Sequence, residues 1–297
     1  VAAACLLKEG HEVEGAYMKN WINEDNITGN CPWQQDIDDA SAVASFLGIN
    51  FQVVNMMREY REKIVHYLLK GYQDGITPNP DVMCNREMKF GVFLDYAMEQ
   101  GFDAVATGHY ARIQDNRDGT KDILCGSDPN KNQTYFLAML DQRQASKAVF
   151  PIGHLLKKDL RSLASEFGLP NAGKKDSQGI CFIGEIKMSD FLRNYVADSP
   201  GNIVNLNGDI LGQHRGLHLY TLGQRKGIGI PSNVYKEAFV VVGKNSDENE
   251  LIVGFDSKET PRLYASKCLI NGLSFVNRVP KENETVFAQP RYRTPAV

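Results

Sequence analysis

Two cysteines of this 297-residue chain lie in local sequences that could activate a thiol, and the first is Cys84. It ends residues 79–84, NPDVMC, and precedes Asn85, whose side chain suits the N-cap of a following helix. A thiol at a helix N-terminus has a lowered pKa, which favours the thiolate, and Asp81 could serve beside it as an acid or base. A buried cysteine in a rigid proline turn explains this motif alone equally well.

The second is Cys181, in residues 174–184, KKDSQGICFIG. The two lysines and the flanking glycines make its surroundings positive and flexible, which favours a thiolate or a persulfide. Composition alone favours a packed strand cysteine instead. No two cysteines lie within four residues, which argues against zinc ribbons, and no three cluster as an iron–sulfur tRNA thiolase would require. The others are interpreted as structural: Cys5, Cys31, Cys125 and Cys268.

Other polar motifs give weaker signals. His109 follows Gly108 at the end of a presumed strand and could simply bond the backbone. His214 and His218 are close in sequence, but a metal site there would lack further ligands, so no metal centre is expected. Residues 223–229, GQRKGIG, suit either a phosphate-contacting turn or a solvated hairpin tip.

The elements that must position these residues alternate between helix and strand in the first half of the chain. This alternation is typical of an open, mostly parallel α/β sheet with helices on both faces, in which ligands bind at the carboxyl ends of strands. The loop at 107–110, TGHY, lies at one such end. Periodicity predicts strands at 13–18, 49–54 and 103–107, and helices at 1–7, 37–47, 60–68, 86–100, 131–140, 157–168 and 187–195.

Beyond Pro200 and Gly201 the chain changes to short apolar runs separated by turn signals such as NGD at 207–209. Residues 239–242 are expected to pair with 251–255 across a polar turn rich in Asn, Asp and Glu. The second half is therefore predicted to form one or two small β domains.

Composition limits the class of protein. No run of eighteen apolar residues and no signal peptide is found, so no membrane segment is expected, and the thiols are expected to be free in a reducing, cytoplasmic compartment. The net charge of −3 excludes an indiscriminate polyanion binder. Because basic residues outnumber acidic ones over 258–297, a nucleic-acid partner would contact the later part of the chain and selected loops.

Five motifs, taken in order, resemble those of the tRNA-specific 2-thiouridylase family over essentially the whole chain. Each alone is a modest signal, but five in order are specific, and they favour the chemical interpretation of both Cys84 and Cys181. The motifs are MKNW at 18–21, TPNPDVMCN at 77–85, ATGHY at 106–110, KKDSQGICFIG at 174–184 and YTLGQRKG at 220–227.

The resemblance implies an adenine-nucleotide α-hydrolase-like sheet of the PP-loop ATP pyrophosphatase type, followed by a small central domain and a C-terminal β-barrel. We expect the catalytic domain at 1–192, a tRNA-contacting central domain at 193–257 and the start of a truncated barrel at 258–297. The family's SGGVDS phosphate loop would lie immediately before Val1, so both ends of the chain are expected to be missing.

The resemblance also implies a mechanism and its ligands. ATP, with Mg²⁺, adenylates the C2 oxygen of the wobble uridine of tRNA, and a persulfide sulfur carried on Cys181 then attacks C2. Cys84 helps to discharge that sulfur and could close a transient disulfide with Cys181. The sulfur is expected to come from a partner protein, a cysteine desulfurase or a sulfur-relay protein.

Family positions carried onto this sequence assign contacts to further residues. Asn132 departs from the family's usual Asp, which weakens that one assignment, whereas an Arg and an aromatic ring suit phosphate contact and base stacking. The expected contacts are Met18 and Gly108 with the nucleotide, Asn79, Pro80 and Asp81 with the target base, and Lys131, Asn132, Gln133, Arg291 and Tyr292 with tRNA.

Two other interpretations stay open on the sequence alone. Another PP-loop ATP pyrophosphatase, activating a different carbonyl, would not need both Cys84 and Cys181. A degenerate relative without a phosphate loop would bind tRNA without catalysis.

Overall fold

The computed structural model describes residues 1–21, 33–174, 188–230 and 237–297, and the chain divides into two compact units. Unit 1 comprises Val1–Val65, Pro80–Glu185 and Gly272–Val297, and unit 2 comprises His66–Asn79 and Ile186–Asn271. No helix among the described residues is both long and apolar enough to cross a bilayer.

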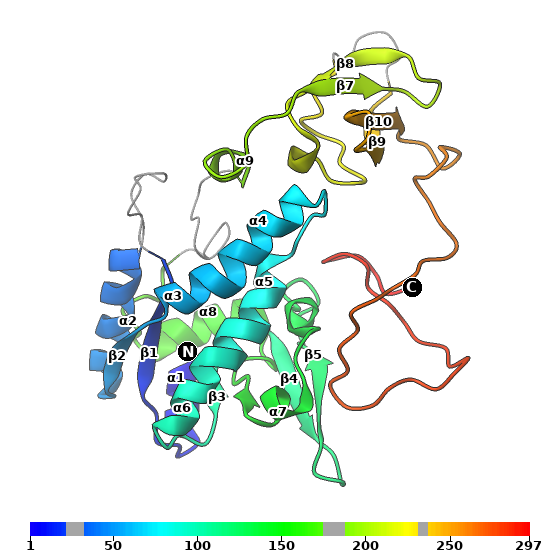
Figure 1. The fold of residues 1–297 in the computed structure, drawn as a ribbon. Coiled ribbons are helices and arrows are strands. Elements are labelled where there is room, and N and C mark those ends of the chain that lie inside the picture. Colours follow the sequence, from blue (N-terminus) through cyan, green and yellow to red (C-terminus); the bar gives the residue numbers. More distant parts are fainter. Residues whose placement is uncertain (22–32, 175–187, 231–236) are drawn as a thin grey trace. The chain divides into compact units, whose positions relative to one another are not determined.

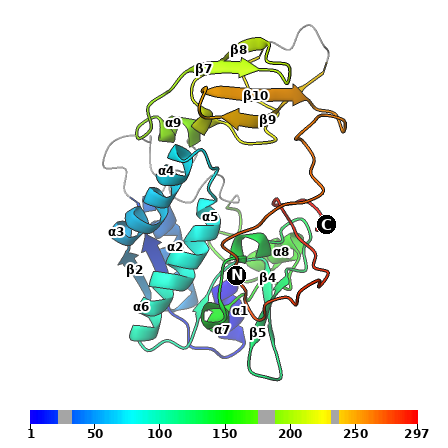
Figure 2. The same cartoon turned by 45° about the vertical axis from the view of Figure 1, so that its right-hand side comes forward.

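Unit 1 contains most of the helices. One continuous helix over residues 80–99 forms the part of unit 1 that carries Cys84; it begins as α5 (Pro80–Met83), continues as the π-helical segment η2 (Cys84–Val92) and ends as α6 (Phe93–Glu99) (Figure 2). The other helical elements of unit 1 are α1 (Ala2–Lys8), α2 (Trp33–Leu47), α3 (Met57–Tyr60), the π-helical η1 (Arg61–Val65), the 3₁₀ turn η3 (Thr134–Leu137), α7 (Gln142–Ser146) and α8 (Lys157–Glu166).

The parallel strands of unit 1 form two separate pairs rather than the single open sheet that we expected. β1 (Gly15–Lys19) pairs with β2 (Phe51–Asn55), and β3 (Val105–Ala106) pairs with β6 (Ala148–Val149). Figure 1 shows α2 beside the first pair, which it contacts through both strands. A sheet extends only where neighbouring strands share backbone hydrogen bonds, and within the described residues no strand joins one pair to the other.

A hydrophobic core fixes the long helix against the second strand pair. Phe90 and Leu94 of this helix are fully buried and pack with Val105 and with Phe150, next to β6. An antiparallel hairpin of β4 (Ala111–Asp115) and β5 (Lys121–Cys125) follows the loop after β3, and its Ala111 belongs to the same core. The loop at 107–110 is therefore held between two packed elements.

Unit 2 is built on a four-stranded sheet. Its strands are β7 (Gly201–Val204), β8 (Ile210–His214), β9 (Phe239–Asn245) and β10 (Glu250–Phe255), in the order β8-β7-β10-β9. The expected antiparallel pairing of 239–242 with 251–255 is confirmed. The remaining elements are α4 (His66–Gln73), α9 (Met188–Leu192) and the short 3₁₀ turn η4 (Leu217–Leu219).

Several expected elements are shorter than predicted, among them the strand at 103–107, which covers only Val105–Ala106. The helix predicted at 131–140 is only the 3₁₀ turn at 134–137, because Asn132 and Gln133 use their side chains to bond nearby backbone groups. Residues 258–297, all of which are described, contain neither helix nor strand.

Candidate active site

Cys84 and Asp81 lie on the first turns of the long helix, although not as the sequence predicted. The helix begins at Pro80, whose fixed φ suits the first helical position, and Asp81 lies in the first turn, where a carboxylate faces the positive end of the helix dipole. Met83 is already helical, with φ −68° and ψ −35°, so Asn85 is not an N-cap. Cys84 lies more than a turn inside the helix and is only 3% exposed.

Asn85 is held inside the protein rather than at a helix end. Its amide nitrogen donates to the carbonyl oxygen of Asp81 at 3.0 Å and to that of Phe136 at 3.2 Å. Its side chain is 2% exposed, and its Oδ1 atom is buried without a hydrogen-bond partner in the described part of the chain. The tertiary acceptor on Phe136 explains why the capping prediction was wrong.

The π-helical segment has identifiable supports. A π-helix shifts the backbone pairing by one residue, and such segments are frequent at functional sites. Gln144, itself fixed by a capping box with Asp141, donates to the carbonyl oxygens of Arg86 at 2.8 Å and Phe90 at 2.9 Å. A Cβ on Gly91 would lie only 2.9 Å from the Arg86 carbonyl oxygen, so this turn requires glycine.

The loop after β3 brings His109 into the core. The side chain is 8% exposed, its Nδ1 atom lies 2.7 Å from Thr107 Oγ1, and its ring packs with those of Phe90 and Phe150 in a cluster of three. Burial lowers the pKa of His109 to about 3, with a smaller lowering by the charge of Lys89. His109 is therefore a neutral imidazole at physiological pH.

The charge of Lys89 also affects the pKa of Asp81. Burial raises the pKa of the Asp81 carboxyl, and the positive charge of Lys89 opposes this rise. A half-buried carboxyl with a raised pKa is a stronger base than an exposed aspartate, which is the property needed to remove a proton from a substrate.

The expected nucleotide contacts lie at the carboxyl ends of two strands of unit 1. Met18 is half-buried in β1, one residue before the strand ends, and Gly108 follows β3. A Cβ added at Gly108 would meet no protein atom closer than 3.9 Å, so packing does not require glycine there. Asn20, just beyond β1, has a buried Oδ1 atom without a partner among the described residues.

The expected tRNA-contacting loop at 131–133 is joined to the loop at 107–110. The Gln133 side-chain oxygen accepts from the Tyr110 backbone N–H, and the Gln133 N–H donates to the Tyr110 carbonyl, both at 3.0 Å. Asn132 accepts from the Thr134 N–H and hydroxyl, and its amide donates to the Cys125 sulfur. Asparagine thus keeps the turn bonds that an aspartate could make and adds one donor.

Tyr292 belongs to an aromatic cluster in unit 1. Its ring centroid lies 4.7 Å from that of Phe136 and 6.0 Å from that of Tyr135, and the guanidinium of Arg293 lies 5.2 Å from the Tyr292 ring. Arg291 is exposed beside it. The cluster combines partly exposed rings with positive charge, the composition of a surface that stacks bases and contacts phosphates.

The remaining predicted positions are placed less completely. Asn79 is assigned to unit 2, where its backbone N–H donates to the Tyr67 hydroxyl at 3.4 Å, and Pro80 is buried. Cys181 lies outside the described residues, so its position relative to Cys84 is not described. Cys84, Cys125 and the other described cysteines carry thiols, and no group of three metal-ligating side chains occurs among the described residues.

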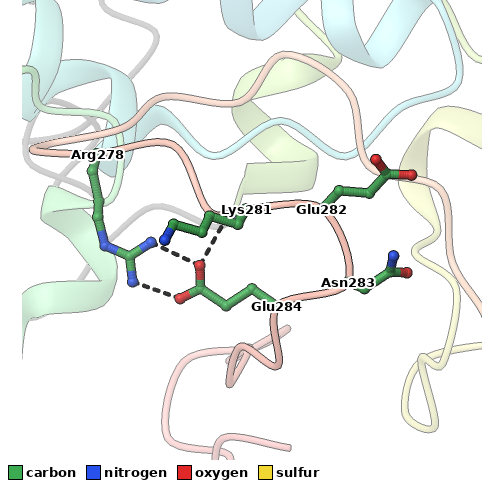
Figure 3. Close-up of a pocket in the computed structure, with 5 residues that line it drawn as sticks. All are labelled: Arg278, Lys281, Glu282, Asn283 and Glu284. Carbon is green, nitrogen blue, oxygen red and sulfur yellow. Dashed lines mark hydrogen bonds and ion pairs between the residues drawn. The ribbon is translucent and has the colours of Figure 1, made fainter.

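A surface hollow in unit 1 contains none of the predicted site residues. It has a volume of about 590 Å³ and is lined by charged and polar side chains of one loop. Figure 3 shows that the two terminal guanidinium nitrogens of Arg278 each donate to one carboxylate oxygen of Glu284. These bonds, together with one from the Lys281 backbone N–H, lower the pKa of Glu284 to about 2. The charges of Arg278 and Glu284 thus neutralise each other at this hollow.

Comparison with known proteins identifies the family. A family model described as tRNA methyl transferase HUP domain matches residues 1–185, and one described as tRNA methyl transferase PRC-barrel domain matches residues 189–255. A protein of Akkermansia muciniphila named tRNA-specific 2-thiouridylase MnmA is 58% identical over 296 residues, covering 100% of this chain and 82% of the relative. The chain belongs to the tRNA-specific 2-thiouridylase family.

More distant members of the tRNA-specific 2-thiouridylase family agree. The proteins of the same name from Alkaliphilus oremlandii and Shewanella sp. (strain MR-4) are 46% and 44% identical, and each match covers 99% of this chain and 80% or 79% of the relative. The matches span both units, so the family's nucleotide-binding HUP domain and its PRC-barrel domain are both represented.

Two residues on the same helix face as Asp81, namely Asn85 and Lys89, were not predicted from the sequence as site residues. Asn85 was interpreted as a cap, and Lys89 was not singled out. The signal was present, because Asp81, Asn85 and Lys89 follow one another at intervals of four residues, which places side chains on one helix face.

Proposed function

We propose that this protein catalyses the ATP-dependent 2-thiolation of the wobble uridine of tRNA. The observation that carries the proposal is the 58% identity to a tRNA-specific 2-thiouridylase over the whole chain. The local geometry supports it, because one helix carries a half-buried carboxyl and a buried thiol, and Phe90 of this helix contacts the ring of His109, which follows Gly108.

The first step activates the base. Asp81, whose pKa is raised by burial, accepts the N3 proton of the uracil, and the C2 oxygen then attacks the α-phosphorus of ATP. ATP enters as its Mg²⁺ complex, and pyrophosphate leaves. C2 is then joined to AMP through its oxygen. Met18 and Gly108 hold the nucleotide, and the space beside Gly108 permits close approach of a ligand.

The second step transfers sulfur. The terminal sulfur of a persulfide on Cys181 attacks C2, and AMP leaves with the C–O bonding electrons. The Cys84 thiolate then attacks the inner sulfur of Cys181, so that a Cys84–Cys181 disulfide forms and the sulfur remains on C2 with the electron pair of the broken S–S bond. N3 regains its proton, and an external dithiol reduces the disulfide.

The substrate tRNA is held by residues around this site. Asn79, Pro80 and Asp81 contact the target base, and the exposed Arg291 contacts a phosphate. Tyr292 offers a partly exposed ring for stacking. The loop that carries Lys131, Asn132 and Gln133 makes further tRNA contacts.

The domain limits and the cellular partners are part of the same proposal. We assign the catalytic domain to 1–192, the central domain to 193–257 and the start of a β-barrel to 258–297. A cysteine desulfurase or a relay protein loads Cys181, and the thiol chemistry places the enzyme in the reducing cytoplasm.

The test is transfer of labelled sulfur to unmodified tRNA by the full-length protein with ATP, Mg²⁺ and a sulfur donor. Wild type should form 2-thiouridine, Cys181→Ser should form none while it retains tRNA binding, and Cys268→Ser, at an exposed cysteine, is the matched control. A folded wild type that binds tRNA but forms no thiouridine would refute thiolation. Because the matching family models are described as methyl transferase domains, a labelled methyl donor is included in a parallel reaction.

A further inference from the structure

Lys89 lies on the same helix face as the two polar groups nearest the candidate base. Asp81, Asn85 and Lys89 are spaced by four residues, and the Asn85 amide bonds the Asp81 carbonyl oxygen along this face. Lys89 is half-buried, whereas most lysines extend into water. The stem of a half-buried lysine can pack against neighbouring side chains while its ammonium stays available to solvent or to a bound anion.

Among the described residues, the Asp81 carboxyl feels the charge of Lys89, but the two side chains form no ion pair. Lys89 forms neither an ion pair nor a side-chain hydrogen bond there. Glu87, on the same helical segment, is already engaged by Lys63 at 3.2 Å and Arg86 at 3.3 Å. No described carboxylate therefore holds Lys89 in an ion pair, and Lys89 lies on the face that also presents the unpartnered buried oxygen of Asn85.

The charge of Lys89 reaches both sides of the proposed reaction. It acts on Asp81, which is proposed to contact the target base, and on His109, which directly follows the proposed nucleotide contact Gly108. The group common to the base and the nucleotide is the phosphate that joins them after adenylation. His109 is neutral and buried, so it cannot supply the positive charge that this phosphate requires.

We propose that Lys89 is a catalytic residue that binds the phosphate linking AMP to the C2 oxygen of the target uridine. This inference rests on the proposed thiolation. The linking phosphate carries one negative charge, and the departing AMP carries two, so a fixed ammonium stabilises the departing group more than the bound intermediate. In this role Lys89 acts through its charge and forms no covalent bond.

The first experiment measures single-turnover thiolation by full-length wild type, Lys89→Met, Lys89→Arg and the control Lys63→Met. Lys89→Met should slow thiouridine formation by about 10²- to 10³-fold with tRNA affinity unchanged, as for removal of one transition-state donor, and Lys89→Arg should restore at least part of the rate. Lys63→Met, which removes only an exposed ion pair, should match wild type. If Lys89→Met does not fold, as judged by circular dichroism, Lys89→Gln takes its place.

The second experiment separates this inference from the proposed function. Calorimetric titration with 5′-AMP needs no sulfur transfer, and Lys89→Met should weaken AMP binding by at least about tenfold, the loss expected for one charge-assisted contact. If wild type forms no thiouridine, thiolation fails, and AMP binding alone then decides whether Lys89 binds phosphate. Unchanged AMP affinity, or a Lys89→Met rate within about threefold of wild type, a difference of well under 1 kcal/mol, overturns the assignment.

Discussion

Acid should destabilise unit 1 through His109, and replacement by Gln should remove that effect. His109 is buried against two phenylalanine rings, and its folded-state pKa is about 3, against 6.5 for an ordinary histidine. Between these two values the unfolded chain binds a proton and the folded chain does not. Stability from this group is therefore fully present above about pH 6.5 and falls as the pH is lowered towards 3.

The magnitude follows from linkage. Each pH unit in this window costs about 1.4 kcal/mol per proton, so the move from pH 7 to pH 5 should remove about 2 kcal/mol from unit 1. The full window down to pH 3 corresponds to roughly 5 kcal/mol, a large share of a domain's stability. Asp81 has the opposite effect, because its raised pKa favours the folded state in acid. Both wild type and His109→Gln contain Asp81, so its contribution cancels when their stabilities are compared.

Urea unfolding at pH 7, 6 and 5 measures this prediction for wild type and His109→Gln. Both tryptophans, Trp21 and Trp33, belong to unit 1, so their fluorescence reports the unit that contains His109. The Gln variant should be less stable at pH 7 but should lose about 2 kcal/mol less than wild type on acidification. His154→Gln, at an exposed position, is the control. Identical losses in wild type and His109→Gln would refute the buried, neutral assignment.

Three further predictions concern the site. Asp81→Asn should lower turnover by about 10²- to 10⁴-fold while the KM for ATP changes little, and an unaltered rate in steady-state assays would remove Asp81 from the acid–base role. Arg291→Ala should weaken tRNA binding and reduce the slope of log K against log salt by about 1; an unchanged slope would mean that Arg291 touches no phosphate. Iodoacetamide should label the exposed Cys125 and Cys268 at least about tenfold faster than the buried Cys84, measured by mass spectrometry, and equal rates would show that the helix opens readily.

Local patterns were sufficient where the decisive interactions are local. The helix α2 follows from apolar residues at helical spacing, with Ala44 on the buried side, and the β9–β10 hairpin follows from two apolar runs around a polar turn. The parallel pairing of β1 with β2 is likewise implied by the alternation of helices and strands. The helix and the hairpin need no distant partner, whereas β1 and β2 pair across 36 positions, as Gly15 with Phe51.

Tertiary partners decided the elements that were predicted wrongly. Asn85 has the side chain of a helix cap, but the Phe136 carbonyl, 51 positions away, draws its amide into the core, and the helix begins at Pro80 instead. The π-helical turn depends on Gln144, which is also remote in sequence. Propensity cannot anticipate these bonds, because the competing acceptors and donors become neighbours only in the folded chain.

The same remote bonds connect the residues proposed to bind tRNA with the residues proposed to do chemistry. Tyr292 packs its ring on Phe136, the Phe136 carbonyl accepts from Asn85, and Asn85 adjoins Cys84 and bonds the Asp81 carbonyl. A base that stacks on Tyr292 would contact a ring that packs on Phe136. The backbone carbonyl of Phe136 in turn accepts a hydrogen bond from Asn85 on the helix that carries Cys84. Because Cys84 is buried and must reach a sulfur to react, a substrate-dependent shift of this helix is a direct physical route from tRNA binding to thiol exposure. Tyr292, Phe136 and Asn85 thus form one connected series of contacts that ends at the helix carrying Cys84.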